Sequence, residues 1–138
     1  MTRKMTVMAS LLAALIGCAA AKENIAPQTK QKLAKRNYLL ALKCEHASIR
    51  NSAIFHVMKY QARFPQDDSR PFVKLLRGMS QNDPSPQNRL YSFLACTFLE
   101  NEKLLQAAGV PPKQEDDKGI YFVRLQEILQ NHEALASQ

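Results

Sequence analysis

Several residue types are scarce in this sequence, and their scarcity excludes whole classes of functional site. The 138 residues include no Trp, only 4 Gly and 3 Cys, and 7% of them are aromatic. The few glycines form no phosphate-cradling loop, and there is no G-x-S-x-G nucleophile elbow. No two cysteines are spaced as C-x-x-C, and His46, His56 and His132 form no H-x-x-x-H pair. We therefore expect no metal site, no cofactor and no catalytic apparatus, so the chain is not predicted to be an enzyme.

Long apolar runs are also missing, except for one at the N-terminus. Thr2-Arg3-Lys4 is followed by an uncharged, mainly apolar run from Met5 to Gly17. A helix of this length reaches about 20 Å, which is short of the roughly 30 Å hydrocarbon layer of a bilayer. A short basic segment followed by such a run is typical of a cleavable export signal.

Two cleavage sites fit the end of this segment. Leu15-Ile16-Gly17-Cys18 resembles a bacterial lipobox, which implies a signal peptide over 1–17, a lipid on Cys18 and a tether over 18–29. Ala19-Ala20-Ala21 instead fits ordinary signal peptidase, with a signal peptide over 1–21. The first site predicts a membrane-anchored lipoprotein facing the periplasm or cell surface. The second predicts a soluble periplasmic or secreted protein.

The remainder, residues 30–138, is predicted to be one all-α domain of about five helices. Periodicity, prolines and capping residues place them at about 30–45, 48–64, 69–80 and 86–101, and from 118 onward. We expect Thr29, Ser48 and Ser85 to cap the first, second and fourth helices. The second helix is apolar over more than half its circumference, so it should be the central one.

The first predicted helix has two unlike faces. Leu33, Leu40 and Cys44 fall on one side and are expected to point inward. The opposite side carries a basic face, composed of Lys32, Lys35, Arg36 and Lys43. It is either an ordinary solvated surface or a site for anionic lipid head groups, acidic wall polymers or an acidic protein. Nucleic acid is not an expected partner of an exported protein.

The positive charge is concentrated in the first half of the chain. Residues 22–66 contain nine basic and two acidic side chains, whereas residues 67–138 contain eight and ten. The basic face of the first helix therefore lies in the half of the domain that would attract anions most strongly.

The sequence also repeats itself. Ile49-Arg50-x-x-Ala53-Ile54-Phe55 matches Asn88-Arg89-x-x-Ser92-Phe93-Leu94, 39 residues further on, and Phe72-Val73-Lys74-Leu75 matches Phe122-Val123-Arg124-Leu125. With Asp83-Pro84 before the second copy, these strings resemble the HEAT-like α-solenoid repeats over about residues 30–101.

The resemblance implies a short array of antiparallel helical hairpins closed by a terminal helix, with an irregular helical bundle as the alternative fold. It further implies a non-enzymatic scaffold that binds an unidentified protein of the cell envelope. Neither the identity of that partner nor the oligomeric state follows from the pattern.

Two cysteines remain in the predicted domain, Cys44 and Cys96. In an oxidising compartment they could form a disulfide, or they could be two separate thiols in the core. Regular stacking of hairpins puts helices between them, and that favours free thiols.

Overall fold

The computed structural model describes residues 26–136, with the side chains of residues 26–132. Its elements, in chain order, are α1 (Pro27–Ala41), α2 (Ala47–Arg63), α3 (Arg70–Asn82), α4 (Pro86–Glu100), α5 (Glu102–Ala108), the short 3-10 helix η1 (Glu115–Asp117) and α6 (Lys118–Ala136). No strand occurs within this range, which confirms the predicted all-α class. The predicted signal peptide, Cys18 and the first part of the tether lie outside the described residues.

Local sequence signals placed some helix ends correctly and others not. Ser85 is the N-cap of α4, and its hydroxyl accepts a hydrogen bond from the Asn88 amide at 3.3 Å. Thr29 and Ser48 were wrong as caps, because α1 begins at Pro27 and α2 at Ala47. Proline at the first helical position needs no partner for an N–H, so the helix starts there and Thr29 falls inside its first turn.

The prediction of about five helices missed α5. Asn101 caps this seven-residue helix by accepting from the Leu104 amide at 3.1 Å. Gly109 ends it with a φ of 72°, a conformation that glycine adopts without strain. The segment had been expected to be only a turn.

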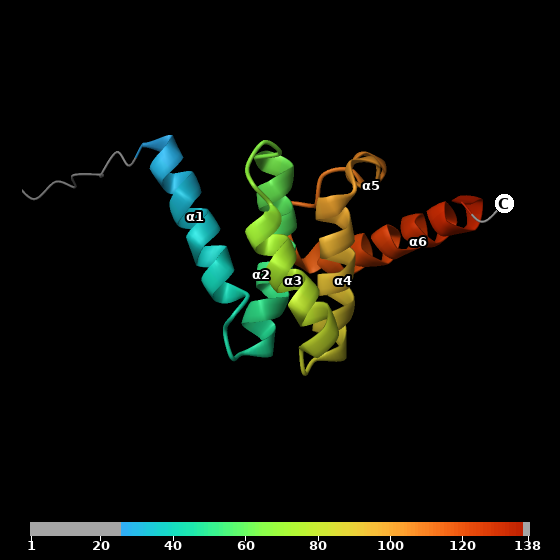
Figure 1. Cartoon of the computed structure of the whole chain (residues 1–138), viewed down its shortest axis with the longest axis horizontal. Helices are drawn as coiled ribbons and strands as arrows, with labels where there is room; N and C mark the ends of the chain where they lie inside the picture. The colour runs from blue at the N-terminus through green and yellow to red at the C-terminus, as the bar shows by residue number, and fades with distance from the viewer. Residues whose placement is uncertain (1–25, 137–138) are drawn as a thin grey trace, which may run out of the picture.

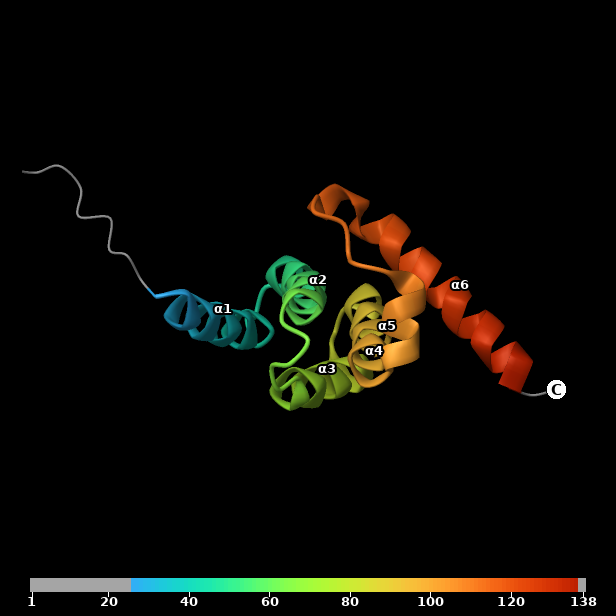
Figure 2. The same cartoon turned by 90° about the horizontal axis from the view of Figure 1, so that it is seen from above.

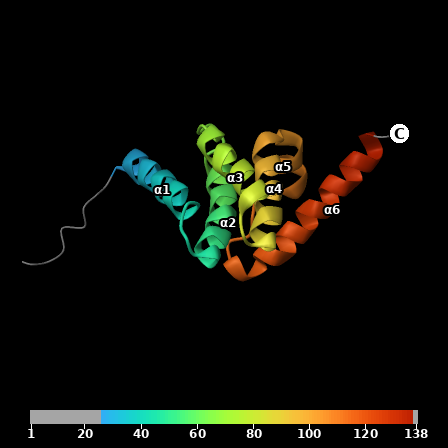
Figure 3. The ribbon, with the colours of Figure 1, turned by 60° about the horizontal axis from the view of Figure 1, so that its bottom comes forward.

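The first four helices form two hairpins that lie side by side. α1 and α2 are antiparallel partners, as are α3 and α4, and α2 lies beside α4 while α1 contacts α3 (Figures 1 and 2). α6 runs obliquely across the outside of this pair and extends past α5 (Figures 2 and 3). α2 is therefore covered on several sides, and the prediction that it is central is confirmed by its nine buried residues.

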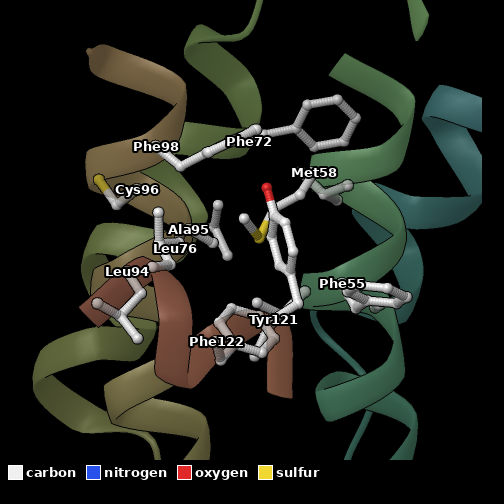
Figure 4. Packing of buried hydrophobic residues seen from close by; sticks show 14 of the residues in the cluster. Phe55, Met58, Phe72, Leu76, Leu94, Ala95, Cys96, Phe98, Tyr121 and Phe122 are labelled. Carbon is white, nitrogen blue, oxygen red and sulfur yellow. The ribbon is translucent and has the colours of Figure 1, made fainter. Parts of the chain in front are cut away.

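The core lies between α2, α3, α4 and the first half of α6. Figure 4 shows Phe55 and Met58 of α2 facing Ala95 of α4, with Tyr121 and Phe122 closing the space from below. The rings of Phe55 and Phe122 lie 6.3 Å apart, centroid to centroid. This aromatic contact anchors α6, the terminal helix, onto the first hairpin.

Four residues expected in the core are exposed instead. Leu33 and Leu40 on α1 are 46% and 58% exposed, and Leu90 and Phe93 on α4 are 43% and 53% exposed. On α1 the inward arc is formed by Ala34, Tyr38 and Leu42, and of these Leu42 is fully buried. A helix with five leucines or tyrosines around its circumference cannot bury all of them against one neighbour, and packing with α2 selected Tyr38 over Leu33 and Leu40.

Candidate functional site

The predicted basic face of α1 is divided in the structure. Lys32, Arg36 and Lys43 are exposed and share one outward strip, since they lie within about 40° of each other at 100° per residue. Lys35 points elsewhere: its Nζ lies 3.1 Å from Asp67 Oδ1 and donates to the Asp68 carbonyl at 2.6 Å. Lys35 therefore ties α1 to the loop before α3, and three of the four predicted residues remain for binding.

Leu33 and Leu40 lie next to that strip on the same outward side of α1. The result is a surface that combines three cations with two exposed leucines, and we call it the α1 face (Lys32, Leu33, Arg36, Leu40, Lys43). Sequence reasoning had assigned these leucines to the core, so it missed this combination. A surface with both properties suits an interface between water and an anionic, partly apolar phase.

A cavity of about 620 Å³ opens between α1 and α2 on the inner side of α1. His56 and Tyr38 stack across it with ring centroids 5.8 Å apart, and Lys59 lines its wall. Burial lowers the pKa of His56, with a smaller opposing effect from Glu115, whose carboxylate lies 3.9 Å from Nε2. Half-buried and packed on a tyrosine, His56 takes the packing role expected for it.

A buried polar network joins the two hairpins. The Arg50 guanidinium of α2 donates from Nε to Asp83 Oδ2 at 2.7 Å and from Nη2 to Asp83 Oδ1 at 2.9 Å. Its third nitrogen donates to the carbonyls of Cys44 and Glu45, in the turn that begins its own helix. Beside this pair, the Asn51 amide donates to Asn88 Oδ1 at 2.9 Å.

Electrostatics reinforces the pairing. The hydrogen bonds from Arg50 hold the pKa of Asp83 below its usual range, and Asp83 in turn raises the pKa of Arg50. Only 2% of the Asp83 side chain and 11% of the Arg50 side chain are exposed. A desolvated pair with two parallel hydrogen bonds fixes geometry strongly, so it sets how one hairpin stacks on the next.

Sequence reasoning had quoted both Arg50 and Asp83 as parts of the repeat but had not paired them. Asn88 had been counted as a departure from the repeat pattern, because an apolar residue is usual at that place. The structure gives it a function, since its side chain also donates to the Ala47 carbonyl at 3.0 Å. A buried polar residue at a stacking position was the signal that pointed to this link.

The two cysteines of the domain are free thiols, Cys44 half-buried and Cys96 buried. Cys96 lies on α4 with its Sγ 3.4 Å from Glu100 Oε2. Burial raises the pKa of this thiol to about 11, and the Glu100 carboxylate adds to the shift. Such a thiol is a poor nucleophile at neutral pH.

Residues 26–136 contain no group of three or more His, Cys, Asp or Glu side chains placed to hold a metal ion. Nor does any helix in that range have the length and apolarity needed to cross a bilayer. Comparison of the chain with protein-family models, with curated proteins and with solved structures finds no match. The functional argument therefore rests on the surfaces and contacts described above.

Proposed function

We propose that this chain is a non-enzymatic, exported cell-envelope protein whose HEAT-like stack of helical hairpins is a scaffold for another protein. The observation that carries the proposal is the Arg50–Asp83 link, because it connects equivalent ends of two consecutive hairpins. Arrays in which each hairpin contacts its neighbours present extended surfaces, and such surfaces generally bind proteins. The step from architecture to function is an analogy between folds.

Export and the lipid anchor are supported by the sequence pattern of residues 1–21 alone. Their test is the intact mass of the mature protein purified from a bacterial membrane fraction. We expect a chain that starts at Cys18 and carries added acyl mass. A chain that starts at Lys22 without lipid would make the protein soluble, and an uncleaved N-terminus would refute export by this signal.

The scaffold function is tested by photo-crosslinking in cells that produce the full chain. A photoreactive amino acid is placed at one exposed position per surface, namely Leu40 on α1, Lys74 on α3 and Phe93 on α4. We expect one position to crosslink a defined protein, and the other two to act as internal controls. Equal, weak labelling of abundant proteins from all three positions would refute the scaffold function.

A second candidate function is favoured by the α1 face. Its three exposed cations and two exposed leucines, at the end of the array nearest the predicted tether, suit binding to an anionic membrane surface. Each basic side chain near such a surface contributes about 1 kcal/mol. Three of them would raise the partition coefficient on the order of 100-fold at low salt.

The matched test uses co-sedimentation with vesicles of neutral lipid, with and without an anionic lipid. We expect the triple variant Lys32→Glu, Arg36→Glu, Lys43→Glu to lose the gain due to anionic lipid. The control variant Lys74→Glu, Lys103→Glu, Arg124→Glu changes the net charge equally at exposed positions elsewhere and should retain it. Equal loss in both variants would show a nonspecific charge effect and exclude the α1 face as the site.

A further inference from the structure

Arg50 and Arg89 occupy the same position in successive hairpins. Arg50 Nη1 donates to the carbonyls five and six residues before it, at 2.7 and 2.8 Å. Arg89 Nη1 likewise donates to the carbonyls five and six residues before it, those of Pro84 and Asp83, at 3.4 and 2.8 Å. The internal repeat of 39 residues is thus reproduced in the hydrogen bonds of the two arginines.

The two arginines differ in what lies beyond them. The other edge of the Arg50 guanidinium holds the Asp83 carboxylate, which belongs to the turn of the next hairpin. Among the ion pairs formed by the described residues, none includes Arg89. Arg89 is half-buried on α4, where a third hairpin would place its acidic turn.

The apolar neighbours of the two arginines show the same difference. On α2, Ile54 and Met58 follow Asn51 at i+3 and i+7, on the side that faces α4, and both are fully buried. The equivalents of Asn51 and Ile54 on α4 are Leu90 and Phe93, which are 43% and 53% exposed. The residues that stack one hairpin on the next are therefore repeated on α4, where no described element covers them.

α6 does not occupy this place. Its Phe122 stacks on Tyr91 with ring centroids 3.9 Å apart, on a neighbouring side of α4. Between the two helices it leaves a cavity of about 380 Å³, lined on α4 by Leu90 and on α6 by Val123. This groove adjoins the uncovered residues and is mainly apolar in its lining.

We propose that the α4 face, composed of Arg89, Leu90 and Phe93, docks a turn and helix of an acidic protein partner, whose carboxylate pairs with Arg89 as Asp83 pairs with Arg50. The inference rests on the proposed scaffold function and names the surface and the chemistry of its partner. A second copy of this chain is a poor occupant. Its free end would present Lys32, Arg36 and Lys43 of α1, and these cations would meet Arg89.

The probe is a synthetic peptide of about 20 residues that begins Asp-Pro-Ser-Pro, like the turn before α4, and continues as an amphipathic helix of Leu, Ala and Glu. The control peptide has Lys in place of its Asp and Glu residues. Binding to the full mature chain is measured by fluorescence anisotropy, and the site is located by amide chemical shifts. We expect the acidic peptide to bind at least about tenfold more tightly, with shifts confined to α4 and the facing side of α6.

Variants of the chain identify the contacts. Phe93→Asp changes an exposed residue, so it should weaken the acidic peptide at least about tenfold without lowering the unfolding temperature. Arg89→Lys keeps the charge but lacks the two-pronged donor, and should weaken it several-fold. Val110→Asp, at a residue that is 79% exposed and belongs to no helix, is the matched control and should bind normally.

The outcomes separate this inference from the scaffold function. Shifts on α1 instead of α4, or unchanged affinity in Phe93→Asp, would overturn the α4 face as the docking site. Crosslinks in cells from Leu40 or Lys74 but not from Phe93 would do the same and would leave the scaffold function standing. Concentration-dependent dimers abolished by Phe93→Asp would replace the acidic partner with a second copy of the chain.

Discussion

Replacing Asp83 with Asn tests whether the Arg50–Asp83 pair holds the two hairpins together. The change keeps the size of the side chain but removes its charge, and it turns one acceptor into an amide that faces the guanidinium. Arg50, which is only 11% exposed, then loses its counter-ion. Breaking a buried pair by removing one partner costs about 3–5 kcal/mol. We expect about 3 kcal/mol, because one acceptor remains and the turn adjoins solvent.

The measurement is urea unfolding of the full mature chain, followed by circular dichroism at 222 nm and extrapolated linearly to water. Asp68→Asn is the control, because its partner Arg70 is exposed and the stability should not change measurably. In the double variant Arg50→Met, Asp83→Leu, the loss should be smaller than the sum of the single losses by about 2 kcal/mol. A loss under about 1 kcal/mol for Asp83→Asn, with additive effects in the double variant, would refute the reasoning.

The same pair has a defined pH dependence. Because Arg50 lowers the pKa of Asp83 in the folded chain, its contribution is complete above the ordinary value of 3.8 and is lost as the pH falls through the lowered value. The difference in unfolding free energy between the native chain and Asp83→Asn should therefore be constant near neutrality and shrink below about pH 4. A difference that stayed constant down to pH 2 would mean that the carboxylate charge is not what stabilises the pair.

Three further predictions concern α1, α4 and α6. Lys35→Glu should destabilise the fold by about 1 kcal/mol or more in urea unfolding, because it replaces an ion pair with Asp67 by repulsion, whereas Lys32→Glu should be neutral. Cys96 should resist alkylation at pH 8 in the folded chain and react on unfolding, as peptide mapping by mass spectrometry would show; rapid labelling would contradict its buried, raised-pKa environment. Phe122→Ala should cost about 3–5 kcal/mol and increase amide hydrogen exchange throughout α6, and exchange confined to residues near 122 would contradict its anchoring role.

Local sequence was sufficient to predict what depends on a few neighbouring residues. Ser85 followed by Pro86 specifies a helix start through one side-chain hydrogen bond and a pre-set φ angle, and both are present in α4. The apolar arc of α2 covers more than half a turn, which leaves burial on several sides as its only stable placement. Chain-wide class and the central helix therefore followed from periodicity and composition.

Which of several similar faces is buried was decided only by tertiary packing. α1 carries leucines, a tyrosine and a lysine at angles that one neighbour cannot cover together, and contact with α2 and the Asp67 loop selected Tyr38 and Lys35. Sequence periodicity treats each leucine as equally inward, so it placed Leu33 in the core. The division of the predicted basic face into three free cations and one structural lysine has the same cause.

The sequence by itself determined the helices, the repeat at 39 residues and the pair of arginines that belong to it. Only the tertiary structure decided that Arg50 meets a carboxylate 33 residues away while Arg89 has none among the described residues. The reason is physical: a repeated sequence specifies the same surface on each hairpin, but whether that surface is covered depends on what is stacked next to it. For α2 the next hairpin is present, and for α4 its place is open.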